Sequence, residues 1–379
     1  KLSAAYVLSD YEWWPAAVES FKLRAALGES GRAPGAFDAM RVWTPVAGDN
    51  GRPGVTPSNP GSPDLGPERT REVEYGFEGT AFENLLSFEF TTYKRRTYDA
   101  LIAMNQVPSL GYGGTQLENV GELKAWGTEA MVSVRPIRTP SVAWEVGGRY
   151  GYTMTEAVDL GGLKQIAAFV PLWQQWIMPG QPIPVYYGPI VQNPNEVGVP
   201  PVYENQVLGG AYPPHTASFN TSLTLAQRLT FSGIGEFQGG HYRTNGTATQ
   251  QVRRGLWPEC MGIRERVIAR DIAGLTARQQ DRCQNQPPYI AWTERGDFFK
   301  LRQVSVSYRV PERFLQWAGA RGGSVLLEGN NLLTITNYSG LDPEAIQGGS
   351  LEGSSGLYRV EYYQLPSARR FLLSVNLNF

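Results

Sequence analysis

Two histidines, His215 and His241, are the only imidazoles in the 379-residue chain. Serine-based catalysis needs a histidine positioned as its general base. His215 begins a predicted strand, and His241 ends one within a Gly-Gly-His-Tyr sequence. Each is therefore expected to lie at the rim of a sheet rather than to act as a base.

Carboxylates in the chain indicate structure more than chemistry. Glu72, Glu74 and Glu78 share one face of a predicted strand and are expected to line a polar interior, not to form an acid–base pair. The Asp-Pro-Glu run at 342–344 could offer calcium ligands, but too few oxygens are in register, so a loop-fixing role is favoured. No His/Cys cluster has zinc spacing, and the Gly-rich run 111–114 lacks the strand–helix context of a phosphate loop. We expect no enzyme, metal or cofactor.

The two cysteines, Cys260 and Cys283, lie in a polar, arginine-rich segment. Two lone cysteines that flank a long loop favour a disulfide formed in an oxidising compartment. Two unpaired thiols are the alternative.

Aromatic side chains in the predicted loops are the candidate ligand-binding residues, because aromatic rings with polar neighbours can stack on sugars or grip peptides. The alternative is that they pack the loops together or form an interfacial girdle. The candidates are Trp43, Trp173, Trp176, Tyr186, Tyr187, Trp257 and Tyr338.

Strands must position these residues, since alternation with a period of two recurs along the chain. Within one of the strands, Gly127 is expected to permit a bulge or bend. About eleven strands are predicted, at 2–7, 21–27, 72–80, 86–92, 118–134, 142–152, 219–225, 229–237, 300–310, 324–330 and 369–379.

The connections alternate between short and long. The short ones are 10–19, 81–84, 136–141, 226–228 and 311–322. The long ones are 28–69, 98–117, 155–214, 240–297 and 332–368. Long structureless loops are uncommon in compact soluble domains, whereas transmembrane barrels have short periplasmic turns and long outer loops. The pattern therefore predicts an all-β, antiparallel transmembrane barrel with long extracellular loops.

The final strand has one apolar and one polar face and stops on an aromatic residue. Such an end is typical of an outer-membrane strand at the lipid interface, and the alternative is an edge strand of a soluble sandwich. If this strand runs toward the periplasm, every short link falls on that side. Its apolar face consists of Phe371, Leu373, Val375, Leu377 and Phe379.

Composition agrees with a β protein that has many turns: 12% of residues are aromatic, with 43 Gly and 27 Pro. The formal net charge of −1 gives no electrostatic case for nucleic acid. No apolar run reaches about 18 residues, which excludes transmembrane helices but not barrel strands. A membrane-spanning sheet must close, and eleven is half of twenty-two.

Two stretches resemble segments of SusC/RagA-like TonB-dependent transporters. They are residues 292–302, WTERGDFFKLR, and residues 328–344, EGNNLLTITNYSGLDPE. Weaker matches at 21–25, 65–68, 119–123 and 238–241, together with the terminal strand, follow in family order. The resemblance implies that residues 1–379 form the carboxy-terminal half of a 22-stranded outer-membrane barrel. The plug domain, TonB box and amino-terminal strands have no counterpart here, so we expect a fragment of a longer protein.

The function implied by the resemblance is TonB-dependent import of a bulky nutrient, either a glycan oligomer or a peptide. A SusD-like surface lipoprotein would act as a lid, and the apolar piece at 170–179 could dock it. The TonB–ExbB–ExbD complex would act through the absent plug, and the barrel-assembly machinery would recognise the terminal strand as its signal. The expected location is the bacterial outer membrane, in contact with lipid and with the carboxy-terminus on the periplasmic side. The alternative is a non-transporting barrel with a surface scaffold or adhesion role.

Overall fold

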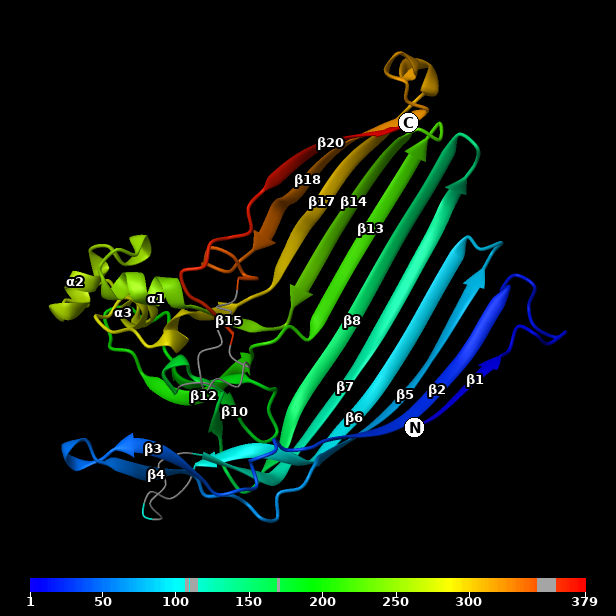
Figure 1. Cartoon of the computed structure of the whole chain (residues 1–379). Coiled ribbons are helices and arrows are strands. Elements are labelled where there is room, and N and C mark those ends of the chain that lie inside the picture. Colours follow the sequence, from blue (N-terminus) through cyan, green and yellow to red (C-terminus); the bar gives the residue numbers. More distant parts are fainter. Residues whose placement is uncertain (106–108, 110–114, 169–170, 346–358) are drawn as a thin grey trace.

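An eleven-stranded antiparallel sheet dominates the computed structural model, which describes residues 1–105, 109, 115–168, 171–345 and 359–379. Each strand pairs with the strand that precedes it in the sheet (Figure 1), so the sheet is a continuous meander. The all-β, antiparallel expectation is confirmed. The strands are β1 (Leu2–Val7), β2 (Ser20–Arg32), β5 (Glu68–Ala81), β6 (Leu86–Asn105), β7 (Thr115–Arg138), β8 (Val142–Leu160), β13 (His215–Leu225), β14 (Leu229–Gly239), β17 (Phe298–Val310), β18 (Gly322–Thr336) and β20 (Arg370–Asn378).

The sheet has one apolar and one polar face because its strands alternate with period two. On the apolar face, Phe77 of β5 stacks on Phe90 of β6 with ring centroids 5.3 Å apart. On the polar face, Glu78 forms ion pairs with Lys22 and Arg24 of β2. Many apolar side chains remain exposed, so this face has no protein layer over it among the described residues.

Short and long connections lie at opposite ends of the sheet. The short-link end carries residues 8–19, 82–85, 139–141, 226–228 and 311–321, the last with the 3₁₀ turns η6 (Glu312–Phe314) and η7 (Gln316–Ala318). Figure 1 shows the carboxy-terminus beside this last turn. The long-link end carries the remaining connections. The alternation inferred from the sequence is therefore present.

The long links fold into structure of their own, contrary to the expectation that they lack it. One forms the hairpin β3 (Val42–Ala47) and β4 (Pro53–Asn59), with η1 (Asp49–Gly51) at its turn. The others form two small sheets and three short helices (Figure 1). These elements are β9 (Ile166–Ala167), η3 (Pro171–Trp173), β10 (Gln175–Ile177), β11 (Val185–Val191), β12 (Tyr203–Gly210), β15 (Tyr242–Asn245), α1 (Gly246–Arg253), η4 (Pro258–Cys260), α2 (Ile263–Ile268), α3 (Ala277–Arg282), η5 (Tyr289–Trp292), β16 (Thr293–Arg295) and β19 (Val360–Glu361).

Three strands run farther than their apolar alternation predicts. β6 continues to Asn105, β7 begins at Thr115, and β8 continues to Leu160, so much of the predicted link 98–117 is strand. In β6 the alternation disappears because residues 100–104 are apolar on both faces, and in β7 and β8 because polar and apolar residues mix and the register shifts at Glu122/Leu123, while the ladder continues. No bulge lies at Gly127, and the register of β7 against β8 shifts instead at Glu122/Leu123 and Val134/Ile137. A Cβ at Gly127 would lie 2.6 Å from the Tyr93 hydroxyl, so this glycine makes room for an aromatic ring.

The elements at the long-link end have their own small cores. Trp292 packs with Ala248, Val252 and the two cysteines. No helix among the described residues is both long and apolar enough to cross a membrane.

Candidate functional site

The polar face of the large sheet holds a hollow of about 600 Å³. It lies where β6, β7, β8, β13 and β14 run side by side, and side chains that point to the polar face line it. The polar lining residues are Glu89, Thr91, Glu129, Arg149, Thr153, Thr216, Ser218 and Glu236.

The hollow contains four charged side chains, and two of them form ion pairs. Glu89 pairs with Arg24, and Glu236 pairs with Arg302. Glu129 and Arg149 have no such partner among the described residues. The hollow therefore offers an unpaired carboxylate, an unpaired guanidinium and several hydroxyls, which suits a polar solute.

A buried ion-pair cluster joins β17 to the loop that follows β18. The Lys300 ammonium lies 2.7 Å from Asp342 and 2.9 Å from Glu344, and its side chain is 3% exposed. Arg302 bridges Glu344 and Glu236. Hydrogen bonding by Arg302 lowers the pKa of Glu344 to about 2, so this carboxylate stays charged at neutral pH. This arrangement fits the loop-fixing role expected for 342–344.

Neither histidine lines the hollow. His241 is buried between β14 and β15, and burial lowers its pKa to about 4, so it is neutral at pH 7. His215 contacts the Tyr150 hydroxyl through Nδ1 at 2.8 Å. No group of three or more His, Cys, Asp or Glu side chains suited to a metal occurs in the described ranges.

Three of the aromatic candidates predicted to contact ligand are buried. Tyr186 is 0% exposed, and its hydroxyl donates to the Arg359 carbonyl at 2.7 Å. Trp173 packs on Tyr289 with ring centroids 4.4 Å apart. The Tyr338 hydroxyl donates to the Thr244 carbonyl at 3.2 Å. All three rings hold the long-link elements together.

The other four candidates are more accessible. Trp43, on the β3–β4 hairpin, is 51% exposed. Trp176 and Tyr187 are half-buried, and the Trp176 indole donates to the Tyr187 carbonyl at 3.1 Å. Trp257 is also half-buried and lies edge-on to Trp292. Only Trp43 presents a largely open ring, and the structure does not bring the seven candidates into one site.

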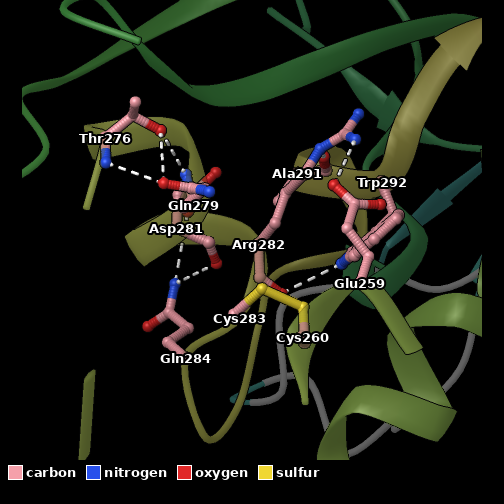
Figure 2. The surroundings of a disulfide bond; sticks show 10 residues. All are labelled: Glu259, Cys260, Thr276, Gln279, Asp281, Arg282, Cys283, Gln284, Ala291 and Trp292. Atoms are coloured by element: carbon pink, nitrogen blue, oxygen red, sulfur yellow. Dashed lines mark hydrogen bonds and ion pairs between the residues drawn. A yellow bond between two sulfur atoms is a disulfide. The ribbon is translucent and has the colours of Figure 1, made fainter. Parts of the chain in front are cut away.

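Cys260 and Cys283 form a disulfide that joins η4 to the end of α3 (Figure 2). Arg282, beside it, stacks on Trp292 at 4.6 Å and pairs with Glu294 at 2.7 Å. The Trp292 indole donates to the Arg282 carbonyl at 3.1 Å, as Figure 2 also shows. The disulfide therefore lies within a packed cluster that we call the stapled lobe, residues 246–294.

β20 is an edge strand whose apolar face is open. Phe371, Leu373 and Phe379 are 76%, 67% and 77% exposed, and Val375 and Leu377 lie on the same face. These five residues continue the apolar face of the large sheet. β1 is the opposite edge.

Comparison with known proteins identifies the family. The sequence profile described as "TonB dependent receptor-like, beta-barrel" matches residues 1–332, which include nine of the eleven strands of the large sheet and most of a tenth, β18. The chain belongs to the TonB-dependent receptor β-barrel family. Barrels of this family lie in the bacterial outer membrane, which accounts for the open apolar face.

Two TonB-dependent receptors of Formosa agariphila, P26 and P3, are 24% and 22% identical to this chain over 94% and 96% of its length. The matches cover 40% of each receptor, so the chain spans about two fifths of the length of these relatives. The solved structure of the RagAB peptide transporter superposes with a TM-score of 0.75 at 18% identity, covering all of this chain and 43% of that one. Because the sequence identity is only 18%, the superposition shows that the two chains share a fold and nothing more specific.

Sequence reasoning missed Glu129 and Arg149. Their only signal was that each lies on the polar side of an alternating strand. Which neighbours they face depends on the register between strands, and that register includes bulges that no single strand reveals.

Proposed function

We propose that this TonB-dependent receptor imports a bulky nutrient, either a glycan oligomer or a peptide, across the outer membrane. The observation that carries the proposal is the family match together with a polar hollow that lies on the same sheet as a folded set of long links. Import would be driven by the TonB–ExbB–ExbD complex acting through a plug that these residues do not include. Residues 1–379 would form the carboxy-terminal part of the barrel. The barrel-assembly machinery would recognise its terminal strand as the assembly signal.

The short-link end is assigned to the periplasm and the long-link end to the outside. Support comes from the folded long links, since long outer loops and short periplasmic turns are the rule for such barrels. The carboxy-terminus at Phe379 would then lie at the periplasmic rim, beside the turn at 311–321.

A SusD-like lipoprotein is the proposed surface partner, and the β3–β4 region is its proposed docking surface. Phe37, Met40 and Val55 are 69%, 56% and 65% exposed there, together with Trp43. Exposed apolar groups that cluster on a surface usually mark an interaction site. The apolar piece at 170–179 is the earlier candidate, and within it Trp173 is buried while Leu172 is 56% exposed.

Uptake by the native organism tests import. Cells that carry the full-length gene should accumulate a labelled glycan oligomer or peptide in a saturable, TonB-dependent manner. Cells with Glu129→Gln and Arg149→Gln should show at least severalfold weaker uptake at equal surface levels. Glu83→Gln, in the short turn at 82–85, is the matched control outside the hollow.

The exposed β3–β4 surface also favours the alternative, a non-transporting scaffold or adhesion barrel. That role predicts capture of a surface partner by purified protein and no ligand uptake. Saturable uptake of any glycan or peptide through the barrel would exclude it.

A further inference from the structure

Basic side chains form a row on the apolar face of the large sheet. The β5–β6 register sets Arg71 opposite Arg96, and the β6–β7 register sets Arg96 opposite Lys124. Glu29 of β2 and Glu156 of β8 end the row on either side. We call Arg71, Arg96 and Lys124 the cation row.

The rows below it are mostly apolar and lead toward the short-link end. The next contains Leu27, Val73, Lys94, Trp126 and Met154. Beyond that lie two more rows, which include Tyr75, Phe77, Phe90 and Tyr150, and then the row of Phe21 and Phe88. The cation row therefore borders the apolar belt at the long-link side.

Strand geometry places the row at the edge of the membrane. Eight residues separate the rows of Phe21 and Glu29, about 27 Å along a strand at roughly 3.4 Å per residue. With a strand tilt near 40° this is roughly 20 Å of membrane depth, close to the apolar band of about 25 Å in such barrels. The cation row would thus meet lipid headgroups.

The local charge is only partly balanced. Arg71 pairs with Glu29 at 2.8 Å, Lys124 pairs with Glu156 at 3.1 Å, and Arg96 pairs with Glu122. Lys94 below the row and Arg69 above it have no carboxylate partner among the described residues. Like charges directly opposite on neighbouring strands are destabilising, so an anion between them would relieve the repulsion.

The cations are also accessible and backed by aromatic rings. The side chains of Arg71, Arg96 and Lys124 are 61%, 53% and 44% exposed. Both arginines lie over Tyr98, at 5.9 and 5.5 Å, and Lys124 lies over Trp126 at 5.6 Å. Guanidinium groups bind phosphate in a bidentate manner, and aromatic residues are favoured at membrane interfaces.

We propose that the cation row, with Lys94 and Arg69, binds the phosphate groups of a lipid in the membrane leaflet nearest the long-link end. The acyl chains of that lipid would lie along the apolar rows below. The proposal rests on the orientation given above, in which this leaflet is the outer one. Continuity with the lipid-facing belt favours a membrane lipid over free phosphate as the source of the ligand.

Lipid binding to the full-length receptor, purified in detergent, tests the proposal. The probes are lipid A with two phosphates, the same lipid with its phosphates removed, and inorganic phosphate, scored by native mass spectrometry. The variant R71Q/R96Q/K124Q should bind phosphorylated lipid A at least tenfold more weakly than wild type. The variant E29Q/E122Q/E156Q breaks the same three ion pairs but frees the cations, and it should bind more tightly.

Arg95→Gln is the matched control, because Arg95 lies between Lys94 and Arg96 but turns to the polar face, where it pairs with Glu72. It should bind lipid as wild type does. Equal binding of phosphate-free lipid, unchanged binding by R71Q/R96Q/K124Q, or full competition by inorganic phosphate would overturn the proposal. The gain expected of E29Q/E122Q/E156Q keeps the test decisive if the first variant fails to fold. Loss of uptake with lipid binding intact would refute only the proposed function.

Discussion

At the scale of single residues, the ion pair between Lys300 and Asp342 makes the strongest prediction. Asp342→Ala should destabilise the receptor by about 1.5–3 kcal/mol, because Lys300 loses a buried charged hydrogen-bond partner but keeps Glu344 at 2.9 Å. The free energy of unfolding, measured in denaturant, checks this. Arg295→Gln breaks an exposed pair with Asp297 and should change stability by less than about 1 kcal/mol. A small effect of Asp342→Ala would mean that Glu344 alone compensates the charge of Lys300.

Asp281 of α3 makes stability depend on pH. Burial raises its pKa to about 6, and its Oδ1 accepts a hydrogen bond from the Tyr203 hydroxyl at 2.9 Å. Because the folded state holds this proton more tightly than the unfolded state, stability should fall as pH rises from about 4 to about 6. The contribution is on the order of 3 kcal/mol, from a pKa raised from 3.8 to about 6.

Asp281→Asn should remove this part of the pH dependence. The measurement is the difference in melting temperature between variant and wild type at pH 4.5 and pH 7. His241, whose pKa is lowered by burial, acts in the opposite direction but is present in both proteins. A constant difference at both pH values would contradict the prediction.

Some residue roles could be predicted from the residue types in the sequence, and others could not. The alternation around Glu78 correctly indicated a polar face, and the sequence at 342–344 indicated a fixed loop. The aromatic candidates were ranked by loop position alone, yet Tyr186 and Trp173 are buried, because the long links fold on one another. Contacts between segments far apart in sequence, such as Gln175 with Arg359, have no local signal.

At the scale of elements, the disulfide should stabilise the stapled lobe without supporting the large sheet. Its cysteines are 23 residues apart, which corresponds to roughly 3 kcal/mol in the chain-entropy model. Cys260→Ser with Cys283→Ser should therefore speed proteolysis between residues 253 and 288 and leave the heat-modifiable barrel intact. Intact mass under non-reducing conditions checks the bond itself, and two free thiols would rule it out.

The effect of an arginine substitution in β20 should depend on which face of the sheet the side chain occupies. Leu373→Arg places a charge on the lipid-facing side, at a cost of up to about 2–4 kcal/mol. It should reduce the yield of heat-modifiable barrel in outer membranes. Ser374→Arg, one residue on and facing the polar side, should assemble nearly normally. An equal loss of barrel yield in both variants would mean that assembly does not depend on which face of β20 carries the charge.

Strand positions were predictable from the sequence where lipid contact imposes alternation, and less so beyond it. The pattern located β2, β13 and β20 well, but it shortened β6 and β8, because the outer portion of β6 is apolar on both faces at 100–104 and that of β8 mixes polar and apolar residues without alternation. The cation row was not predictable either. Arg95 and Arg96 are adjacent in sequence, and only the register shows that one meets Glu72 and the other joins Arg71 and Lys124.

At the scale of the whole molecule, the two sheet edges make a prediction. β1 and β20 each lack a second neighbour among the described residues, and an open edge is costly in lipid. Residues 1–379 refolded alone in detergent should form oligomers or aggregates, whereas the full-length receptor should be a monomeric barrel. Size-exclusion chromatography with light scattering checks this. A stable monomer of residues 1–379 would contradict the need for further strands.

The disulfide has a consequence for the timing of biogenesis. In the proposed orientation Cys260 and Cys283 end outside the cell, while bacteria oxidise thiols in the periplasm. The bond would therefore form first, and the segment it closes would pass through the membrane as a ring rather than as a single thread. Insertion of the β14–β17 hairpin would then be the step that requires the widest opening in the assembling barrel.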